Sequence, residues 1–334
     1  MTHRAILTIF FLTSFVVAFG QQQHVAEGRT MGTTYRVIYF DEPLNRDFGA
    51  AIDSLLVAVN KAISTYDPDS EISRFNKSKK GIRFEGPHFR DILLACREIY
   101  RSSGGVFDPT VMPLVDAWGF GPGKSQHLAT ATIDSILTFV GFDRIRLKRK
   151  KVCKRDPRIQ LDMGGIGQGY GADVIYSFLK SHGVQHMLIE LGGEGMAAGR
   201  NIKKDRAWTI GILDPNSTPT HQFFKAYVTL GSEAYTTSGN YFNYKVINGR
   251  KHGHTIDPKT GRSVAHTLLS ASVFAPNCTV ADGWATALMV MGPERAIETV
   301  SKEKGLEAVL MYSTPDGEVE TYITPGIRER VVLE

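Results

Sequence analysis

The chain has 334 residues, of which 39 are lysine or arginine and 34 are aspartate or glutamate, giving a formal net charge of +5. Hydrophobic residues make up 42% of the chain and charged residues 22%. These proportions are ordinary for a globular protein and allow one large domain or two closely packed ones. The mild excess of positive charge suits a small anionic substrate, although most proteins with this balance bind nothing because of it.

The three cysteines, Cys96, Cys153 and Cys278, are odd in number and include no C-x-x-C pair. This pattern argues against a disulfide scaffold or a cysteine zinc site, and it leaves open a single Cys153–Cys278 bridge. The serine-hydrolase motif G-x-S-x-G and the zinc motif H-E-x-x-H are absent. Neither serine acyl transfer nor a zincin site therefore has a starting point.

Residues 1–20 have the form of a secretory signal peptide. A short basic start, MTHR, precedes the apolar run Ala5–Phe19, which is too short for a committed membrane span, and AFG forms a small-residue cleavage site. We expect cleavage near Gly20, which leaves residues 21–334 as one soluble domain exported to the periplasm. No cysteine precedes Cys96, so we expect no lipoprotein anchor, and no later stretch is suited to span a membrane.

The first half of the chain mixes strand and helix patterns. Alternating polarity predicts a half-buried strand at 31–40, and apolar residues three or four apart predict helices at 48–63, 87–102 and 132–140. Between them we expect a polar loop at 66–76 and an ordered, irregular loop at 107–123, which is rich in proline, glycine and aromatic residues.

The second half is dominated by closely spaced strand patterns. They fall at 207–214, 224–231, 233–239, 241–247 and 269–276, followed by helices at 279–291 and 293–304 and a final pair of strands. Because the strands after Ala207 follow one another without crossover helices, we predict an α+β fold: a single large domain with a mostly antiparallel sheet and packed helices.

The glycine-rich stretch LDMGGIGQGYGAD (Leu161–Asp173) fits the dinucleotide fingerprint G-x-G-x-x-A. A strand-like run at 158–163 precedes it, a helix-like run at 168–182 follows, and Glu190 ends the next apolar run where a ribose-binding acid would lie. A Rossmann dehydrogenase is therefore one interpretation. It requires several consecutive βαβ units, however, and the sequence offers one, so we reject it.

Two further motifs favour ordinary explanations. WGFGPGKS has tryptophan where a phosphate-binding P-loop needs its first glycine, and no helix follows directly. RIRLKRKKVCKR (Arg144–Arg155) carries eight basic residues in twelve. Since no aromatic residues lie among them, we expect a solvated hairpin tip and no nucleic-acid partner.

Asp282 and Thr286 are four residues apart on a predicted helix and so share one face. A carboxylate and a hydroxyl suit a hard cation such as Mg²⁺, which favours few protein ligands. Equally, Thr279 and Asp282 have the spacing of a helix-capping box. His252 and His254 precede the polar loop IDPKTG, where a histidine can reach a ligand or simply be solvated.

Taken together, the chain resembles the ApbE family of FAD:protein FMN transferases from about Glu27 to Gly326. The matching segments occur in order: EGRTMGTTYRV, STYDPDSEISRFN, GGVFDPTVMPLVDAWGFG, LDMGGIGQGYGAD, LIELGGE, TSGNYFNY, HTIDPKTG and CTVADGWATALMVMG. The resemblance implies a T-fold-related α+β architecture and FAD as the dinucleotide. In that case Asp162 and Glu190 need not bind a ribose.

The resemblance also implies a set of site residues. The family's FAD contacts fall on Met31, Tyr66, Val106, Phe107, Asp108, Asp162, Gln168 and Ile256. Its Mg²⁺ ligands fall on the backbone carbonyl of Gly165 and the side chains of Asp282 and Thr286. Many members carry a lipid-anchoring cysteine after the signal peptide, which this chain lacks, so membrane attachment is not implied.

The implied reaction is Mg²⁺-dependent flavinylation. A threonine or serine hydroxyl of a client protein attacks the FMN-side phosphorus of FAD, and AMP leaves. We take His254 as the residue that activates the hydroxyl, because an imidazole with a pKa of about 6.5 accepts protons at neutral pH. The implied clients are redox-pump subunits and exported flavoproteins with a D-x-x-[ST]-G-[AS]-[ST]-like segment. An FAD pyrophosphatase and an exported FAD carrier remain alternatives.

Overall fold

The computed structural model describes residues 22–334 except 42–43, 123–128, 219, 241–243 and 248–249. The expected signal peptide lies outside the described residues. Within them, no helix combines the length and the apolar content needed to cross a bilayer. Cys96, Cys153 and Cys278 are all free, so the Cys153–Cys278 bridge that the sequence left open does not form.

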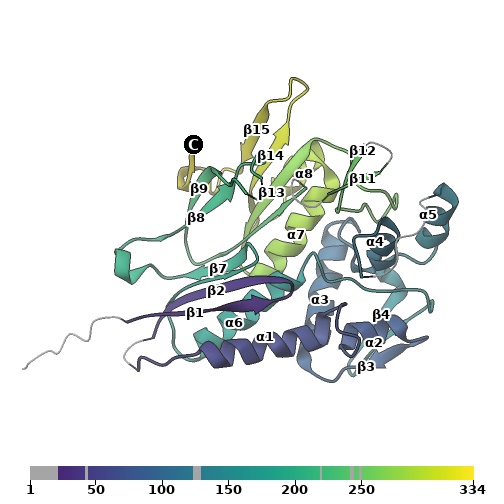
Figure 1. The fold of residues 1–334 in the computed structure, drawn as a ribbon, viewed down its shortest axis with the longest axis horizontal. Helices are drawn as coiled ribbons and strands as arrows, with labels where there is room; N and C mark the ends of the chain where they lie inside the picture. The colour runs from purple at the N-terminus through teal and green to yellow at the C-terminus, as the bar shows by residue number, and fades with distance from the viewer. Residues whose placement is uncertain (1–21, 42–43, 123–128, 219, 241–243, 248–249) are drawn as a thin grey trace, which may run out of the picture.

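An eight-stranded sheet runs through the molecule (Figure 1), and each pairing of neighbouring strands in it is antiparallel. The predicted antiparallel α+β fold is thus confirmed. In spatial order the strands are β1 (Gln23–Thr30), β2 (Thr33–Phe40), β6 (His186–Leu191), β7 (Glu194–Ala198), β10 (Ala234–Gly239), β13 (Leu268–Ala275), β14 (Glu307–Ser313) and β15 (Val319–Ile323).

Three smaller sheets accompany it. They are β16 (Val331–Leu333), β9 (Phe224–Leu230) and β8 (Trp208–Leu213); β3 (Gly81–Arg83), β5 (Lys151–Lys154) and β4 (Ile145–Lys148); and the hairpin of β11 (Tyr244–Ile247) and β12 (Arg250–Gly253). The sheet of β8, β9 and β16 encloses a hydrophobic cluster with one face of the large sheet, to which Trp208, Val228 and Phe274 contribute.

Helices cover the other face of the large sheet and enclose the main core. They are α1 (Gly49–Ile63), α2 (Glu71–Lys77), α3 (Pro87–Ser102), α4 (Met112–Trp118), α5 (Thr130–Leu137), α6 (Gly167–Ser181), α7 (Cys278–Met291) and α8 (Pro293–Val300). Figure 1 shows α7 in the middle of the molecule, where it packs against α6, β10 and β13. All but one of its residues from Cys278 to Ala285 are buried, as a central helix requires.

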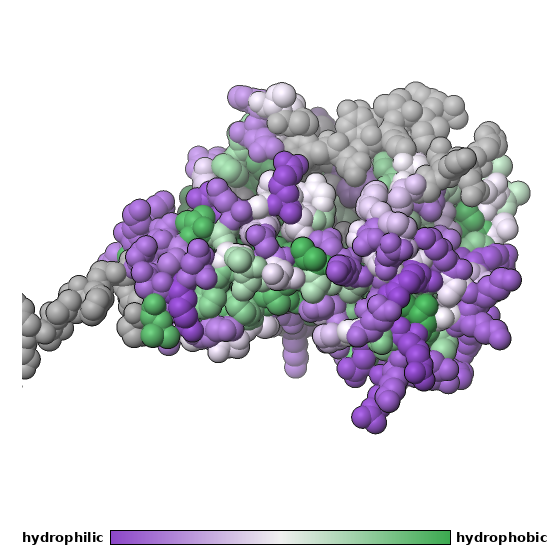
Figure 2. All heavy atoms as spheres, turned by 60° about the horizontal axis from the view of Figure 1, so that its bottom comes forward, coloured by the Kyte–Doolittle hydropathy of each residue, from purple (hydrophilic) through white to green (hydrophobic). Residues whose placement is uncertain are grey.

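The outer surface carries most of the charge. Figure 2 shows the side of the molecule on which α1 lies, with hydrophilic residues over both ends of the view and paler or hydrophobic ones between them. On α1, Val57 is exposed while Ile52 and Val59 are fully buried, so the predicted amphipathic helix is confirmed. The basic run Arg144–Arg155 forms the β4–β5 hairpin with an exposed tip, as expected.

The structure corrects both loops expected in the first half. The polar stretch 66–76 contains α2, because Ser70 caps it by accepting a hydrogen bond from Ser73 N (3.1 Å). The stretch 107–123 contains a 3₁₀ turn and α4, which ends at Gly119 with a left-handed φ of 76°. Neither segment has a long apolar repeat, and in each a local cap sets where the helix begins or ends.

The structure also corrects the strand expected at 158–163, so the single βαβ unit is absent. Leu161 N donates to Asn76 Oδ1 (2.7 Å), and Asn76 Nδ2 donates to Leu161 O (2.9 Å), in place of a neighbouring strand. The ammonium of Lys154 is buried and donates to Ile159 O (2.8 Å). Side chains therefore satisfy a backbone whose sequence pattern resembles a strand.

Helices α6 and α7 cap each other's N-termini. Asp173 on α6 accepts hydrogen bonds from Cys278 N (2.8 Å), Thr279 N (2.8 Å) and Thr279 Oγ1 (2.5 Å), at the start of α7. In return Asp282 Oδ2, on α7, accepts from Gly169 N (2.9 Å) in the first turn of α6. A carboxylate at a helix N-terminus satisfies unpaired N–H groups and interacts favourably with the helix dipole.

Asp173→Ala should destabilise the protein more than Asn277→Ala. Asn277 caps α7 locally, by accepting from Val280 N (2.9 Å), and its loss should cost about 1 kcal/mol. Loss of Asp173 leaves three donors near the buried helix junction without a charged acceptor, which should cost about 2–3 kcal/mol. Urea unfolding of both variants measures the difference, and equal values would contradict the mutual capping.

Candidate functional site

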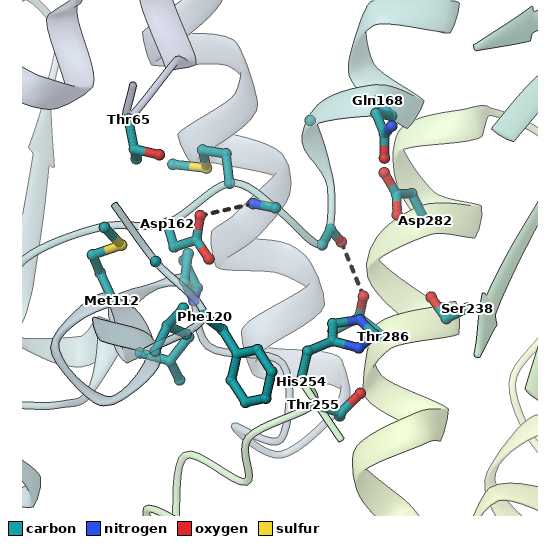
Figure 3. A pocket seen from close by; sticks show the side chains of 18 of the residues that line it. Thr65, Met112, Phe120, Asp162, Gln168, Ser238, His254, Thr255, Asp282 and Thr286 are labelled. Atoms are coloured by element: carbon teal, nitrogen blue, oxygen red, sulfur yellow. Dashed lines mark hydrogen bonds between the residues drawn. The ribbon is translucent and has the colours of Figure 1, made fainter. Parts of the chain in front are cut away.

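A cavity of about 840 Å³ opens between α7, the glycine-rich loop before α6, the C-terminal end of α1 and the segment leading into α4. Figure 3 shows side chains from these elements pointing into it. All the predicted site residues line this one cavity: Met31, Tyr66, Val106, Phe107, Asp108, Asp162, Gly165, Gln168, His254, Ile256, Asp282 and Thr286. The structure thus brings together residues spread over 256 positions of sequence.

The glycine-rich loop lies directly against α7. Thr286 Oγ1 donates to Gly165 O at 3.3 Å (Figure 3), so two predicted metal ligands are neighbours. A Cβ at position 165 would lie 2.6 Å from Thr286 Oγ1, and one at Gly169 would lie 2.4 Å from Cys278 O. Side chains at either position would therefore push the loop and α7 apart. These glycines serve close packing of backbone against a helix.

Two buried carboxyl groups face the cavity beside this loop. Burial raises the pKa of Asp282 to about 7, and its side chain lies close to that of Gln168 in Figure 3. Burial, followed by the proximity of Asp282, raises the pKa of Glu194 well above its usual range. Glu194 Oε2 has no hydrogen-bond partner among the described residues. Both groups would be stabilised as carboxylates by a cation in the cavity.

The donors at this place suit one kind of metal. No group of three or more His, Cys, Asp or Glu side chains in the described part of the chain could hold a metal ion. A zinc-type site is therefore not found there. One carbonyl, one hydroxyl and one carboxylate are oxygen ligands, and Mg²⁺ typically takes only one or two carboxylates together with water and phosphate oxygens. The residues present fit Mg²⁺.

The predicted FAD contacts occupy different parts of the wall. Met31 has a left-handed φ of 49° at the turn between β1 and β2, a conformation that costs energy for a residue other than glycine. Tyr66 is 75% exposed at the cavity mouth, whereas Val106 and Phe107 are almost fully buried. Aromatic and aliphatic surface of this kind suits a planar ring system.

Asp108 differs from the other predicted contacts. Its carboxylate is turned inward, where it accepts hydrogen bonds from Thr110 N (2.8 Å), Thr110 Oγ1 (2.6 Å) and Phe142 N (3.1 Å). Burial raises the pKa of Asp108 to about 6, despite these donors. The side chain therefore organises the 108–111 turn, and any ligand contact at Asp108 is left to its backbone.

His254 lines the cavity from the loop that follows β12. Its ring is half-buried and packs edge-to-face on Phe120, with centroids 6.4 Å apart and planes at 70°. Like Thr286, it lines the cavity. The side chain of His252, two residues earlier on β12, lies outside the described part of the structure.

Sequence reasoning missed several residues of the cavity wall, including Glu194, Met112, Phe120 and Ser238. It considered Glu190, whose carboxylate in fact accepts from Gly193 N (2.8 Å) and stabilises the turn between β6 and β7. Glu194 and Ser238 lie in the family-like segments LIELGGE and TSGNYFNY, but nothing in the local pattern distinguishes them from their neighbours.

The comparisons with known proteins agree with this geometry. A profile of the ApbE family matches residues 31–310. The FAD:protein FMN transferase of Vibrio cholerae is 33% identical, over 89% of this chain and 89% of its own length. That of Escherichia coli K12 is 32% identical, over 93% of this chain and 90% of its own length. The solved flavin transferase ApbE of Vibrio cholerae superposes with a TM-score of 0.83 at 30% identity, covering 93% of this chain and all of that one. The chain belongs to the ApbE family.

Proposed function

We propose that this enzyme transfers FMN from FAD to a threonine or serine hydroxyl of a client protein and releases AMP. The observation that carries the proposal is the convergence of all the predicted flavin-contacting, metal-binding and catalytic residues on one cavity. The relatives named FAD:protein FMN transferase support the same reaction. The acceptor oxygen forms a bond to the FMN-side phosphorus, the pyrophosphate P–O bond breaks, and AMP leaves with the bridging oxygen.

The residues suited to hold Mg²⁺ are Asp282, Thr286 and the carbonyl of Gly165. When bound there, the ion would neutralise negative charge that develops on the pyrophosphate. The protein contributes the rest of the arrangement. Mutual capping of α6 and α7 fixes Asp282, leaving its second carboxylate oxygen for the cavity. The hydrogen bond between Thr286 and Gly165 holds the loop at the helix.

His254 is the residue suited to accept the acceptor proton. It lines the same cavity as Thr286 and packs against Phe120, which restricts its ring. A positioned base that removes the hydroxyl proton makes the oxygen a better nucleophile as the bond to phosphorus forms. The flavin contacts proposed for Met31, Tyr66, Asp162 and Gln168 lie on other parts of the wall, so proton transfer and flavin binding are separable.

A single assay separates this function from its alternatives. Purified protein is incubated with FAD and Mg²⁺, with and without a peptide bearing the D-x-x-[ST]-G-[AS]-[ST]-like segment that we propose for clients. AMP released only with peptide indicates a transferase, AMP released regardless indicates an FAD pyrophosphatase, and FAD bound without AMP release indicates a carrier. We expect the first result, with FMN mass added to the peptide.

We further propose that residues 1–20 are a signal peptide and that residues 21–334 act outside the cytoplasm, in the periplasm. The basic start and short apolar run of the N-terminus support this. Mass spectrometry of exported protein should find a first residue near Gln21, and an intact Met1 in that material would contradict the proposal.

Affinity for Mg²⁺ should depend on pH. Because the pKa of Asp282 is raised to about 7, protons compete with the cation below that pH and not above it. We expect the apparent affinity to fall about tenfold for each pH unit below 7 and to level off above it. Calorimetric titration with MgCl₂ in the presence of FAD tests this. A flat profile would exclude Asp282 as the ligand.

Asp282→Ala should abolish Mg²⁺-dependent turnover and leave the fold largely intact. The variant loses the proposed cation ligand, whereas loss of its cap on Gly169 costs only about 1 kcal/mol. AMP release and thermal unfolding measure the two effects. Glu190→Gln is the control, because this carboxyl group lies in a turn and not in the cavity wall. Full activity, or outright unfolding, of Asp282→Ala would show that the residue is structural.

His254→Ala should slow the chemical step about 10²–10⁴-fold, the usual contribution of a positioned general base. FAD affinity should change little, because the flavin and pyrophosphate contacts lie elsewhere. His252→Ala is the control, because it removes a second histidine two residues earlier in the chain, on β12. Single-turnover kinetics and fluorescence titration of FAD give the two readouts. The reverse ranking, or loss of FAD binding in His254→Ala, would mean that the role is misassigned.

A further inference from the structure

Strand β10 has a partly unpaired edge. It pairs with β13 from Ala234 to Gly239, but with β7 only through Ala234 and Tyr235. Strand β7 begins at Glu194, and the preceding turn cannot extend the ladder. The N–H groups of Gly192 and Gly193 instead donate to Thr34 O (3.0 Å) and Glu190 Oε1 (2.8 Å). Among the described residues, the last part of β10 therefore has a neighbouring strand on one side only.

The backbone groups on this edge can be identified from the ladder. Asn240 N donates to Leu269 O of the β13 segment, so every second residue before it also faces β13. Thr237, whose Oγ1 lies 2.7 Å from Ser272 Oγ, occupies the intervening, non-hydrogen-bonded position. The N–H and C=O groups of Thr237 and Gly239 accordingly point away from β13, and no hydrogen bond among the described residues occupies them.

This edge is part of the catalytic cavity. Thr237, Ser238 and Gly239 line it together with His254 and Thr286. The side chain of Thr236 faces α7, since its Oγ1 lies 3.8 Å from Cys278 Sγ. Because side chains alternate along a strand, the side chain of Ser238 points to the same face as that of Thr236. Figure 3 shows Ser238 on the side of the cavity where α7 carries Thr286. Backbone groups that no protein atom occupies inside a substrate cavity are available to a ligand with complementary backbone groups.

We propose that the client protein's acceptor segment binds in extended form along this edge, as an additional antiparallel strand beside β10. The inference rests on the proposed transferase function. Free strand edges bind extended peptides through main-chain hydrogen bonds, and the pairings around β10 in the large sheet are antiparallel. Main-chain recognition requires little of the client's side chains except small size, which suits a segment of glycine, alanine and serine.

The pairing also fixes the register. Side chains directly opposite each other on paired strands point to the same face of a sheet. The acceptor threonine must therefore lie opposite Ser238, where its hydroxyl points toward α7 and the site of Asp282 and Thr286. Its two neighbours then lie opposite Thr237 and Gly239, and exchange hydrogen bonds with them. The acceptor's own N–H points away from β10.

Thr237→Pro tests the edge from the enzyme's side, with Thr237→Val as the matched control. Both variants lose the hydroxyl, but only proline also removes the outward N–H, and proline is tolerated where a strand's N–H has no partner. With the synthetic peptide Asp-Gly-Ala-Ser-Gly-Ala-Thr-Gly-Ala, we expect proline to raise the KM for peptide at least about tenfold over valine. FAD affinity, measured on both, verifies that each is folded. Equal KM values would overturn the strand proposal.

Backbone N-methylation of the same peptide tests the proposal without altering the enzyme. Methylation of either neighbour of the acceptor threonine should abolish flavinylation by the wild-type enzyme, while methylation of the threonine itself should be tolerated. Uniform sensitivity, or loss only at the threonine, would overturn the strand proposal and leave the transferase function standing. If the unmethylated peptide is not flavinylated while AMP is released without it, the proposed transferase function itself fails.

Discussion

The exchange of carboxylates between α6 and α7 is the interaction on which the site depends. Asp173 satisfies the first N–H groups of α7, and Asp282 satisfies Gly169 N in α6, so neither helix can slide without leaving buried donors unpaired. Gly169 permits the close approach, because any side chain there would collide with Cys278 O. The same contact brings Gly165 O within hydrogen-bond distance of Thr286. A packing contact between two helices thus brings together the residues of the proposed cation site.

Burying several carboxyl groups at the cavity costs free energy, and this cost points to a functional role. Burial raises the pKa values of Asp162, Asp282 and Glu194, and the last two also repel each other. A core selected only for stability would not place an unpartnered Glu194 carboxyl oxygen beside Asp282. Met31, held in a left-handed conformation at the cavity wall, adds backbone strain at the same place. Such departures from optimal packing are typical of functional sites.

The cavity has two walls suited to two different kinds of ligand. Its inner wall offers apolar surface and a glycine-rich loop for a small phosphorylated molecule, whereas its β10 side offers backbone hydrogen-bonding groups. His254 lines the same cavity, in the loop that follows β12 and against Phe120. The large sheet therefore does more than support the helices. Where the pairing of β7 with β10 ends, after Tyr235, the edge of β10 is the place proposed for the second substrate of the transfer reaction.

The sequence by itself determined the elements whose pattern is local and long. The helix at Pro87–Ser102 falls at the predicted residues, and β9 (Phe224–Leu230) falls within the strand predicted at 224–231, because apolar spacing, an initial proline and closing glycines act within the segment. Short helices such as α2 and α4 depend on single caps, which the sequence pattern did not reveal. The run 158–163 has a strand-like pattern, yet Asn76 and Lys154, distant in sequence, bind its backbone instead.

For the candidate site, too, some features followed from the sequence and others from the tertiary structure. Ordered motifs named its residues through their resemblance to a family, and spacing alone placed Asp282 and Thr286 on one face of a helix. Only the tertiary structure decided that Asp108 faces inward, that Glu194 and not Glu190 reaches the cavity, and that Asp173 holds α7 in place. These outcomes depend on contacts between segments far apart in the chain, and local sequence carries no record of which side chain will meet which backbone group.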